Sequence, residues 1–142
     1  MADTKPDFEI RDHTADVLLF VRGADLGTLF RNALAGLYAV VGQFAVAGPG
    51  ESATIELSAG DAEELFHDWL AEALFRLEAH RCVLRNVRFE TVSETAVRAQ
   101  VDAVPFDRQR SEFDREVKAV TYHELAVTRT HDEWTASVVL DI

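Results

Sequence analysis

Two segments of this chain repeat apolar residues three and four positions apart, the spacing that places them on one face of an α-helix. They are residues 26–41 and residues 62–77. Asp25 is well placed to cap the first helix. Asp61 and Glu64 form a variant of the capping box at the start of the second. Each helix has an apolar face to bury, so the rest of the chain must supply a layer against which both can pack.

The remaining segments have the composition and alternation of β-strands. Strands are expected at residues 8–10, 17–22, 53–57, 83–92, 96–104, 117–122, 125–130 and 134–140. The last three are expected to form a closing meander. Because each helix connects strands and strands dominate the second half, the order predicts an α+β fold. We expect two layers, with a mainly antiparallel sheet and both amphipathic helices packed on one face. A length of 142 residues fits one domain, residues 1–142.

The charge of the chain indicates which partners it can bind, and its cysteine content indicates its cellular compartment. The formal net charge is −11, from 14 Lys and Arg against 25 Asp and Glu. Such a surface repels polyanions, so little or no direct nucleic-acid binding is expected, whereas cation binding or docking onto a basic protein suits it. A purely solubilising role for the charge remains the alternative. A single cysteine, Cys82, suits a reducing compartment. The N-terminus is too acidic for a signal peptide and no apolar run could span a bilayer, so we expect a soluble, cytoplasmic protein with no membrane contact.

No motif of an established catalytic type is present. The sequence lacks a phosphate-binding loop, a dinucleotide-binding glycine pattern and a G-x-S-x-G nucleophile elbow. Its five histidines are dispersed, without zinc-ligand spacing. Cys82 has apolar neighbours and is expected to be a small core residue. The sequence therefore favours a protein that is not an enzyme.

Three polar segments lie where local structure alone does not explain them. His13 and Asp16 stand between two expected strands, where turn hydrogen bonds are one interpretation and a site is the other. Asp141 and Ile142 end the chain, which puts a side-chain carboxylate beside the terminal one. Two such anions repel unless a cation or donors lie between them, although a frayed, solvated tail is the alternative. Lys118 lies within an expected strand and could simply face solvent.

Two further charged segments leave alternatives open. Glu64, Asp68 and Glu72 form a stripe along the second helix. This stripe is either a solvated face or a set of ligands turned toward a cation or a partner. Residues 107–116 carry both charge signs and form either a solvated loop or a segment beside a site.

Taken together, four segments resemble the archease family. They are HTAD at 13–16, DWLAE at 68–72, VKAVTYH at 117–123 and LDI at 140–142. Their order and spacing agree with the family over essentially the whole chain. The resemblance implies a two-layer fold on a mainly antiparallel sheet. It also implies a role in tRNA processing, as a cofactor protein of the tRNA-splicing RNA ligase.

That ligase joins RNA ends bearing a 2′,3′-cyclic phosphate or 3′-phosphate to 5′-hydroxyl ends. Its own histidine becomes guanylylated, with GTP and manganese. By resemblance, this chain would promote guanylylation and multiple turnover, and a chaperone-like role has also been proposed for the family. The family's cation site, expected to hold calcium, corresponds to Asp16, Asp141 and Ile142. Lys118, His13 and Glu72 correspond to residues with a role in activating the partner.

The chain departs from the family pattern at one position. Many relatives carry a histidine shortly after the aspartate of the loop before the lysine strand, whereas here Asp107 is followed by Arg108 and no histidine through Ser111.

Two competing functions are open. The first is a general chaperone or adaptor without a metal role. The second is a small metal-dependent hydrolase using His13 or His123 as acid or base.

Overall fold

Two helices lie among the strands of three sheets in the computed structural model, which describes residues 5–12 and 15–142. The helices are α1 (Leu26–Val41) and α2 (Ala62–His80). The largest sheet has the order β1-β2-β10-β8, with β9 also paired to β10. Its strands are β1 (Phe8–Asp12), β2 (Asp16–Gly23), β8 (Ala119–Val120), β9 (Ala126–Arg129) and β10 (Trp134–Asp141). A three-stranded sheet has the order β4-β6-β5, and β3 pairs with β7. These strands are β3 (Gly42–Gln43), β4 (Glu51–Ser58), β5 (Cys82–Val92), β6 (Ala96–Pro105) and β7 (Glu112–Phe113).

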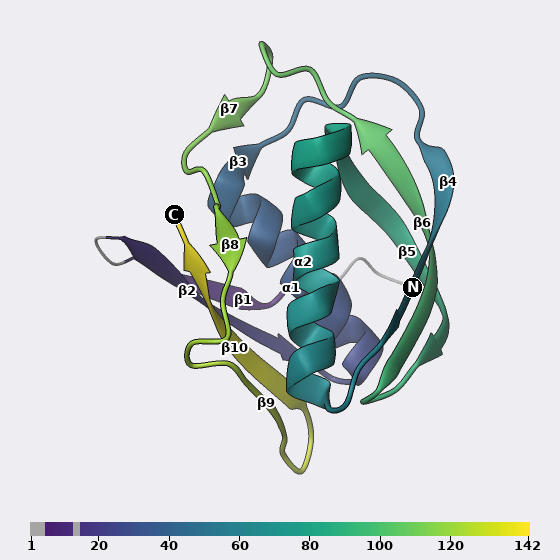
Figure 1. Cartoon of the computed structure of the whole chain (residues 1–142), viewed down its shortest axis with the longest axis vertical. Coiled ribbons are helices and arrows are strands. Elements are labelled where there is room, and N and C mark those ends of the chain that lie inside the picture. The colour runs from purple at the N-terminus through teal and green to yellow at the C-terminus, as the bar shows by residue number, and fades with distance from the viewer. Residues whose placement is uncertain (1–4, 13–14) are drawn as a thin grey trace.

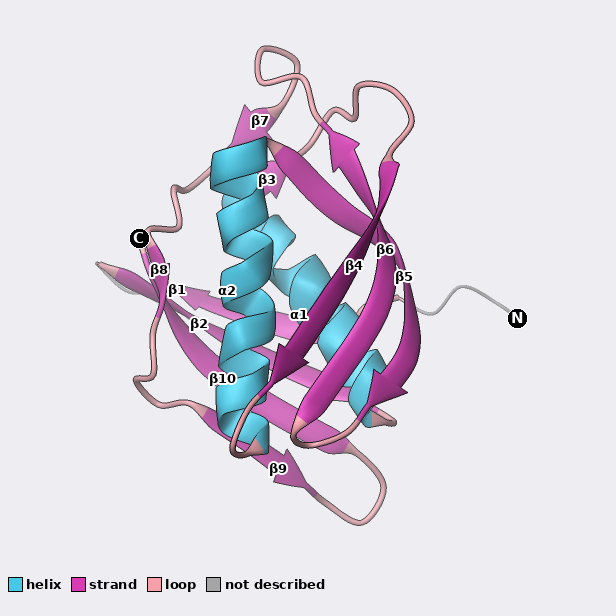
Figure 2. Cartoon of the chain, turned by 45° about the vertical axis from the view of Figure 1, so that its right-hand side comes forward, coloured by secondary structure: helices cyan, strands magenta, loops and turns pink. Residues whose placement is uncertain are grey.

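The predicted α+β class and the antiparallel pairing are confirmed, since every strand pair is antiparallel. The structure adds that the strands divide between separate sheets, and that each helix contacts both larger ones. Figure 2 shows β4, β5 and β6 on one side of the helices and β1, β2 and β10 on the other. The cause lies in α1, whose buried residues extend beyond a single narrow stripe, so one sheet cannot cover them all.

Both helices begin at the predicted caps. The Asp25 side chain accepts a hydrogen bond of 2.7 Å from the Thr28 backbone N–H, and this bond lowers the pKa of the Asp25 carboxyl. Asp61 accepts from the Glu64 backbone N–H at 2.9 Å, while the Glu64 side chain accepts from Gly60. Helix α1 ends at Gly42, whose φ of 151° is rare for other residues. A Cβ there would also collide with the carbonyl oxygen of Glu112 in β7.

The core fills the space between the helices and the two larger sheets. At its centre the Trp69 indole stacks on the Phe30 ring at 5.7 Å between ring centroids. The Trp69 Nε1–H also donates to the Phe30 carbonyl at 2.9 Å, so the largest buried side chain leaves no polar atom without a partner. This contact joins α2 to α1 directly.

The expected closing meander is wrong in one respect. The predicted strand at 117–122 is reduced to the two residues of β8, and both β8 and β9 pair with β10. A turn separates β8 from β9. The Thr121 hydroxyl donates to the Val139 carbonyl and accepts from the His123 backbone N–H. Glu124 then adopts a φ of 52°. The Thr121 backbone N–H also donates to the Val139 carbonyl at 3.1 Å, so the contact with β10 extends to Thr121 and the chain turns after it.

Within the described part of the chain, no helix is long and apolar enough to span a bilayer.

Candidate cation site at the chain terminus

The last strand of the chain returns to the strand that begins at Asp16. Strands β2 and β10 are antiparallel, and their register places Asp16 directly opposite Asp141. Residues directly opposite on neighbouring strands have Cβ atoms about 5 Å apart on the same sheet face. Val17 and Leu140 are fully buried toward the helices, so the two aspartates lie on the outer face. Asp16 is half-buried and Asp141 is exposed.

The terminal residue is held in place. The Ile142 backbone N–H donates to the Ala15 carbonyl at 3.3 Å. Its side chain packs against the core. Figure 1 shows the yellow C-terminal end of β10 beside β8 and the strands of the β1–β2 pair. The terminus is therefore not the frayed tail of the alternative interpretation, and its main-chain carboxylate follows the paired aspartates directly.

Lys118 contacts the same corner, next to Asp141, through its backbone. Its N–H donates to the Asp141 carbonyl at 2.7 Å, and Ala119 is the register partner of Asp141. The Lys118 side chain is exposed, and it forms no ion pair within the residues that the structure describes. Three segments distant in the sequence thus meet around Asp141.

The chemistry of this corner is that of unmatched anions. Among residues 5–12 and 15–142, neither Asp16 nor Asp141 forms an ion pair. Like charges directly opposite on paired strands destabilise the sheet. Over the same residues no group of three His, Cys, Asp or Glu side chains could hold a metal ion. The groups that the structure brings together at this corner are these two carboxylates and the main-chain carbonyls of Ala15 and Asp141. Such oxygen-only groups, completed by water, fit hard cations such as calcium.

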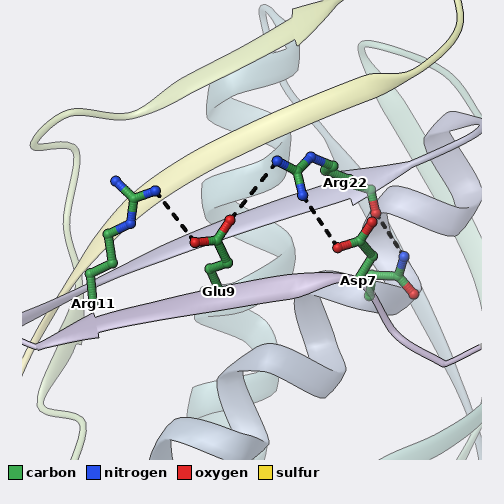
Figure 3. Close-up of polar contacts among 5 residues, drawn as sticks. Asp7, Glu9, Arg11 and Arg22 are labelled. Atoms are coloured by element: carbon green, nitrogen blue, oxygen red, sulfur yellow. Dashed lines mark hydrogen bonds and ion pairs between the residues drawn. The ribbon is translucent and has the colours of Figure 1, made fainter.

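Outer-face charges elsewhere in the same sheet are matched. Figure 3 shows Arg22 of β2 extending toward Asp7 and toward Glu9 of β1, at 3.6 and 3.9 Å. Arg11 approaches Glu9 at 3.4 Å. Asp7, which precedes β1, and three residues of β1 and β2 thus alternate in sign, unlike the two aspartates at the other end of β2.

The other predicted site residues lie apart from this corner or are engaged elsewhere. His13 lies outside the described residues. Glu72 accepts from the Arg76 guanidinium, one helical turn away, at 2.7 Å. Asp68 contacts the His67 ring at 3.0 Å, and Glu64 accepts from Gly60. Each acid of the α2 stripe thus has its own local contact, as expected of a polar helix face.

The side chains considered for catalysis are not assembled into a catalytic group in the described part of the chain. His123 is exposed and lies 3.6 Å from Glu124. Cys82 is buried, and that burial raises the pKa of its thiol. A raised thiol pKa makes the nucleophilic thiolate scarcer.

Sequence reasoning missed two features near the terminus. The first is the ion pair between Arg115 and Asp12, at 2.9 and 3.0 Å. The second is an open groove of about 560 Å³ beside the C-terminal half of α2. The segment 107–116 contributes much of its wall, so this charged loop lies beside a groove. The lining residues are Val41, Phe44, Leu74, Leu77, Glu78, Arg81, Phe106, Arg108, Phe113, Asp114, Arg115, Glu116 and Val117.

Comparison with known proteins identifies the family. The model of the Archease protein family (MTH1598/TM1083) matches residues 8–142. The chain is 32% identical to Protein archease of Methanosarcina barkeri, over all of both chains. It is 33% identical to Protein archease of Methanopyrus kandleri, covering 92% of this chain and 96% of the relative.

Solved structures agree on the fold. The solution structure of protein 1598 of Methanobacterium thermoautotrophicum matches with a TM-score of 0.73 and 27% identity, covering 95% of this chain and 98% of that one. The crystal structure of an archease from Thermotoga maritima, described as a possible chaperone, matches with a TM-score of 0.68. It is 20% identical and covers 100% of this chain and 99% of that one. The chain belongs to the archease family.

Proposed function

We propose that this archease activates a tRNA-splicing RNA ligase, promoting guanylylation of the ligase and multiple turnover. In this proposal it acts in the cytoplasm as a single domain, through protein contacts of a chaperone-like kind. The observation that carries the proposal is the register of Asp16 opposite Asp141, next to Ile142, whose backbone N–H donates to the Ala15 carbonyl.

A divalent cation at this corner is the second part of the proposal. The carboxylates of Asp16 and Asp141 and the terminal carboxylate of Ile142 would hold it, with water completing the coordination. Calcium is the ion that we expect, because it accepts six to eight oxygen ligands in irregular arrangements. A bound divalent ion would offset the repulsion of the paired aspartates and could act beside the nucleotide site of the partner.

Lys118 would act on the partner rather than on the cation. Its backbone bond to Asp141 places the residue at the edge of the corner while its side chain remains exposed. A formal net charge of −11 favours contact with a basic protein surface over contact with free RNA. His13 and Glu72 are lesser candidates for the same surface.

The deciding experiment is a reconstituted ligation with the cognate ligase, comparing a single turnover with many. Asp16→Ala and Asp141→Ala are expected to lower multiple-turnover ligation to the level without archease while leaving the first turnover of pre-guanylylated ligase unchanged. Arg98→Ala, on the far sheet, is the matched control and should activate like the wild type. Unchanged multiple turnover with both aspartate variants would refute an activating role for the site.

Two alternative functions are separated by simple measurements on the protein alone. A general adaptor without a metal role should bind calcium no differently after deletion of Ile142. A metal-dependent hydrolase should turn over generic phosphoesters when supplied with calcium, magnesium or manganese. We expect weaker calcium binding after the deletion and no turnover of phosphoesters.

A further inference from the structure

Arg115 links two segments that are far apart in the sequence. Its Nε donates to one Asp12 carboxylate oxygen at 3.0 Å and its Nη2 donates to the other at 2.9 Å. This two-point geometry is the strongest that an arginine and a carboxylate form. The Arg115 side chain is 25% exposed and the Asp12 side chain 57%, so solvent screens the pair from the Asp12 side.

The same residue also completes the C-terminal end of α1. Its Nη1 donates to the Val40 carbonyl at 3.0 Å, while the backbone N–H groups of Asp114 and Arg115 donate to the Val41 carbonyl at 2.7 and 3.3 Å. The last carbonyls of a helix lack partners within the helix and favour a nearby cation. Helix α1 has no basic residue in its own last turn, so Arg115 supplies that charge from another segment.

Both segments joined by Arg115 lead directly to the candidate cation site. Asp12 ends β1 and is the register partner of Val17, the residue after Asp16. On the other side, Arg115 lies three residues before Lys118, whose backbone bonds to Asp141. Arg115 therefore fastens the end of the β1–β2 pair and the segment leading into β8 to one rigid point, the end of α1.

We propose that Arg115 is a positioning residue, which sets the geometry of the Asp16, Asp141 and Ile142 oxygens by holding Asp12. This inference rests on the proposed cation site, although Arg115 itself would touch no ligand of the ion.

Electrostatics alone and lost positioning predict opposite changes in calcium affinity when Arg115 is removed. Removing a positive charge near a cation site should strengthen cation binding. If Arg115→Ala weakens calcium binding instead, lost positioning must outweigh the gain in negative charge. The double variant Asp12→Ala with Arg115→Ala keeps the net charge while removing the pair with Asp12 and, with it, the bond from Arg115 to the Val40 carbonyl.

The experiment has two readouts on the full chain, each made well below the unfolding temperature measured for each variant. The first is hydrogen exchange of the amides of residues 15–18 and Ile142 in calcium-free protein. The second is calcium affinity by titration calorimetry. The matched control is Glu90→Ala with Arg98→Ala, which removes an arginine–carboxylate pair at 3.3 Å from the far sheet without changing net charge. Asp12→Asn, which keeps the shape of the side chain and the bond between Arg115 and Val40, serves if the double variant does not fold.

We expect the Asp12 and Arg115 double variant to exchange these amides about tenfold faster, since hydrogen bonds between charged groups contribute enough for a change of that order. Its calcium affinity should fall about fivefold, less than the loss caused by removing a direct partner of a metal ligand. The control should leave both readouts unchanged. Wild-type exchange rates in the double variant, or wild-type calcium affinity, would overturn the role of Arg115. Absence of calcium binding by the wild type would instead overturn the cation site, and the exchange rates would then decide on Arg115 alone.

Discussion

Charges on the outer face of the three-stranded sheet are paired, whereas the two carboxylates at one corner of the larger sheet stand opposite each other. On the three-stranded sheet, Arg98 of β6 lies between Glu56 of β4 and Glu90 of β5, at 3.2 and 3.3 Å. On the larger sheet, Asp16 and Asp141 stand opposite each other, and neither has an ion-pair partner in the described ranges. The first arrangement stabilises strand pairing, whereas the second opposes it. Residues that cost stability and have no structural role are the ones to suspect of a function.

The largest expected effect is stabilisation by a divalent cation bound at the Asp16–Asp141 corner. At calcium concentrations about 100-fold above the dissociation constant, the free energy of unfolding of the wild type should rise by about 2.7 kcal/mol. Thermal unfolding with calcium and with a chelator measures this rise. The double variant Asp16→Asn with Asp141→Asn should show no rise, while Arg98→Ala should keep it. An equal rise in the free energy of unfolding in all three proteins would mean that calcium does not act through Asp16 and Asp141.

Deletion of Ile142 should affect both stability and cation binding. The half-buried side chain packs against the core, so its loss should lower the free energy of unfolding by about 1 kcal/mol. The deletion also moves the terminal carboxylate back to Asp141, so calcium affinity should fall as well. Ile142→Ala is the matched control, because it removes most of the side chain and leaves the carboxylate in place. Denaturant unfolding and calcium titration of both variants separate the two contributions, and equal calcium affinity in both would argue against the terminal carboxylate as a ligand.

In the absence of a cation, neutralising the unmatched pair should stabilise the protein. Asp16→Asn with Asp141→Asn removes the repulsion of opposed carboxylates, which should raise the free energy of unfolding by about 0.5 kcal/mol. Denaturant unfolding in chelator at low salt measures the change. A loss of stability would mean that these carboxylates accept structural hydrogen bonds in the folded protein.

The smallest effect on stability is expected from Arg98, on the outer face of the three-stranded sheet. A hydrogen bond from Gln100, followed by contacts with Arg98, lowers the pKa of Glu90. A lowered carboxyl pKa contributes stability that is fully present above the pKa of the unfolded chain, about 4.3, and is lost as the pH falls through the folded value. Arg98→Ala should therefore slightly lower the unfolding temperature at pH 7, less so in high salt, and have less effect at strongly acidic pH. Thermal unfolding across pH and salt tests this, and a salt-independent loss would show that packing of the Arg98 side chain matters more than its charge.

Local patterns predicted the helices and most strands because they depend on neighbours within a few residues. Asp25 and Asp61 cap the two helices as expected, since a cap bonds to a backbone N–H only three residues away. The strand predicted at 117–122 was wrong because its apolar alternation does not reveal the side-chain bonds of Thr121, which turn the chain. The division into separate sheets was missed for a similar reason: an apolar stripe shows that a helix is buried, but not how many layers bury it.

The sequence by itself determined which residues carry the charges and where the helices and most strands form. It also carried the family resemblance, through four short segments in a fixed order. Only the tertiary structure decided that Asp16 faces Asp141, that Ile142 is held by Ala15, and that Arg115 reaches Asp12. The physical reason is range. Propensity and periodicity act over a few residues, whereas the register between the first and last strands depends on how the whole core packs, and no local pattern encodes it.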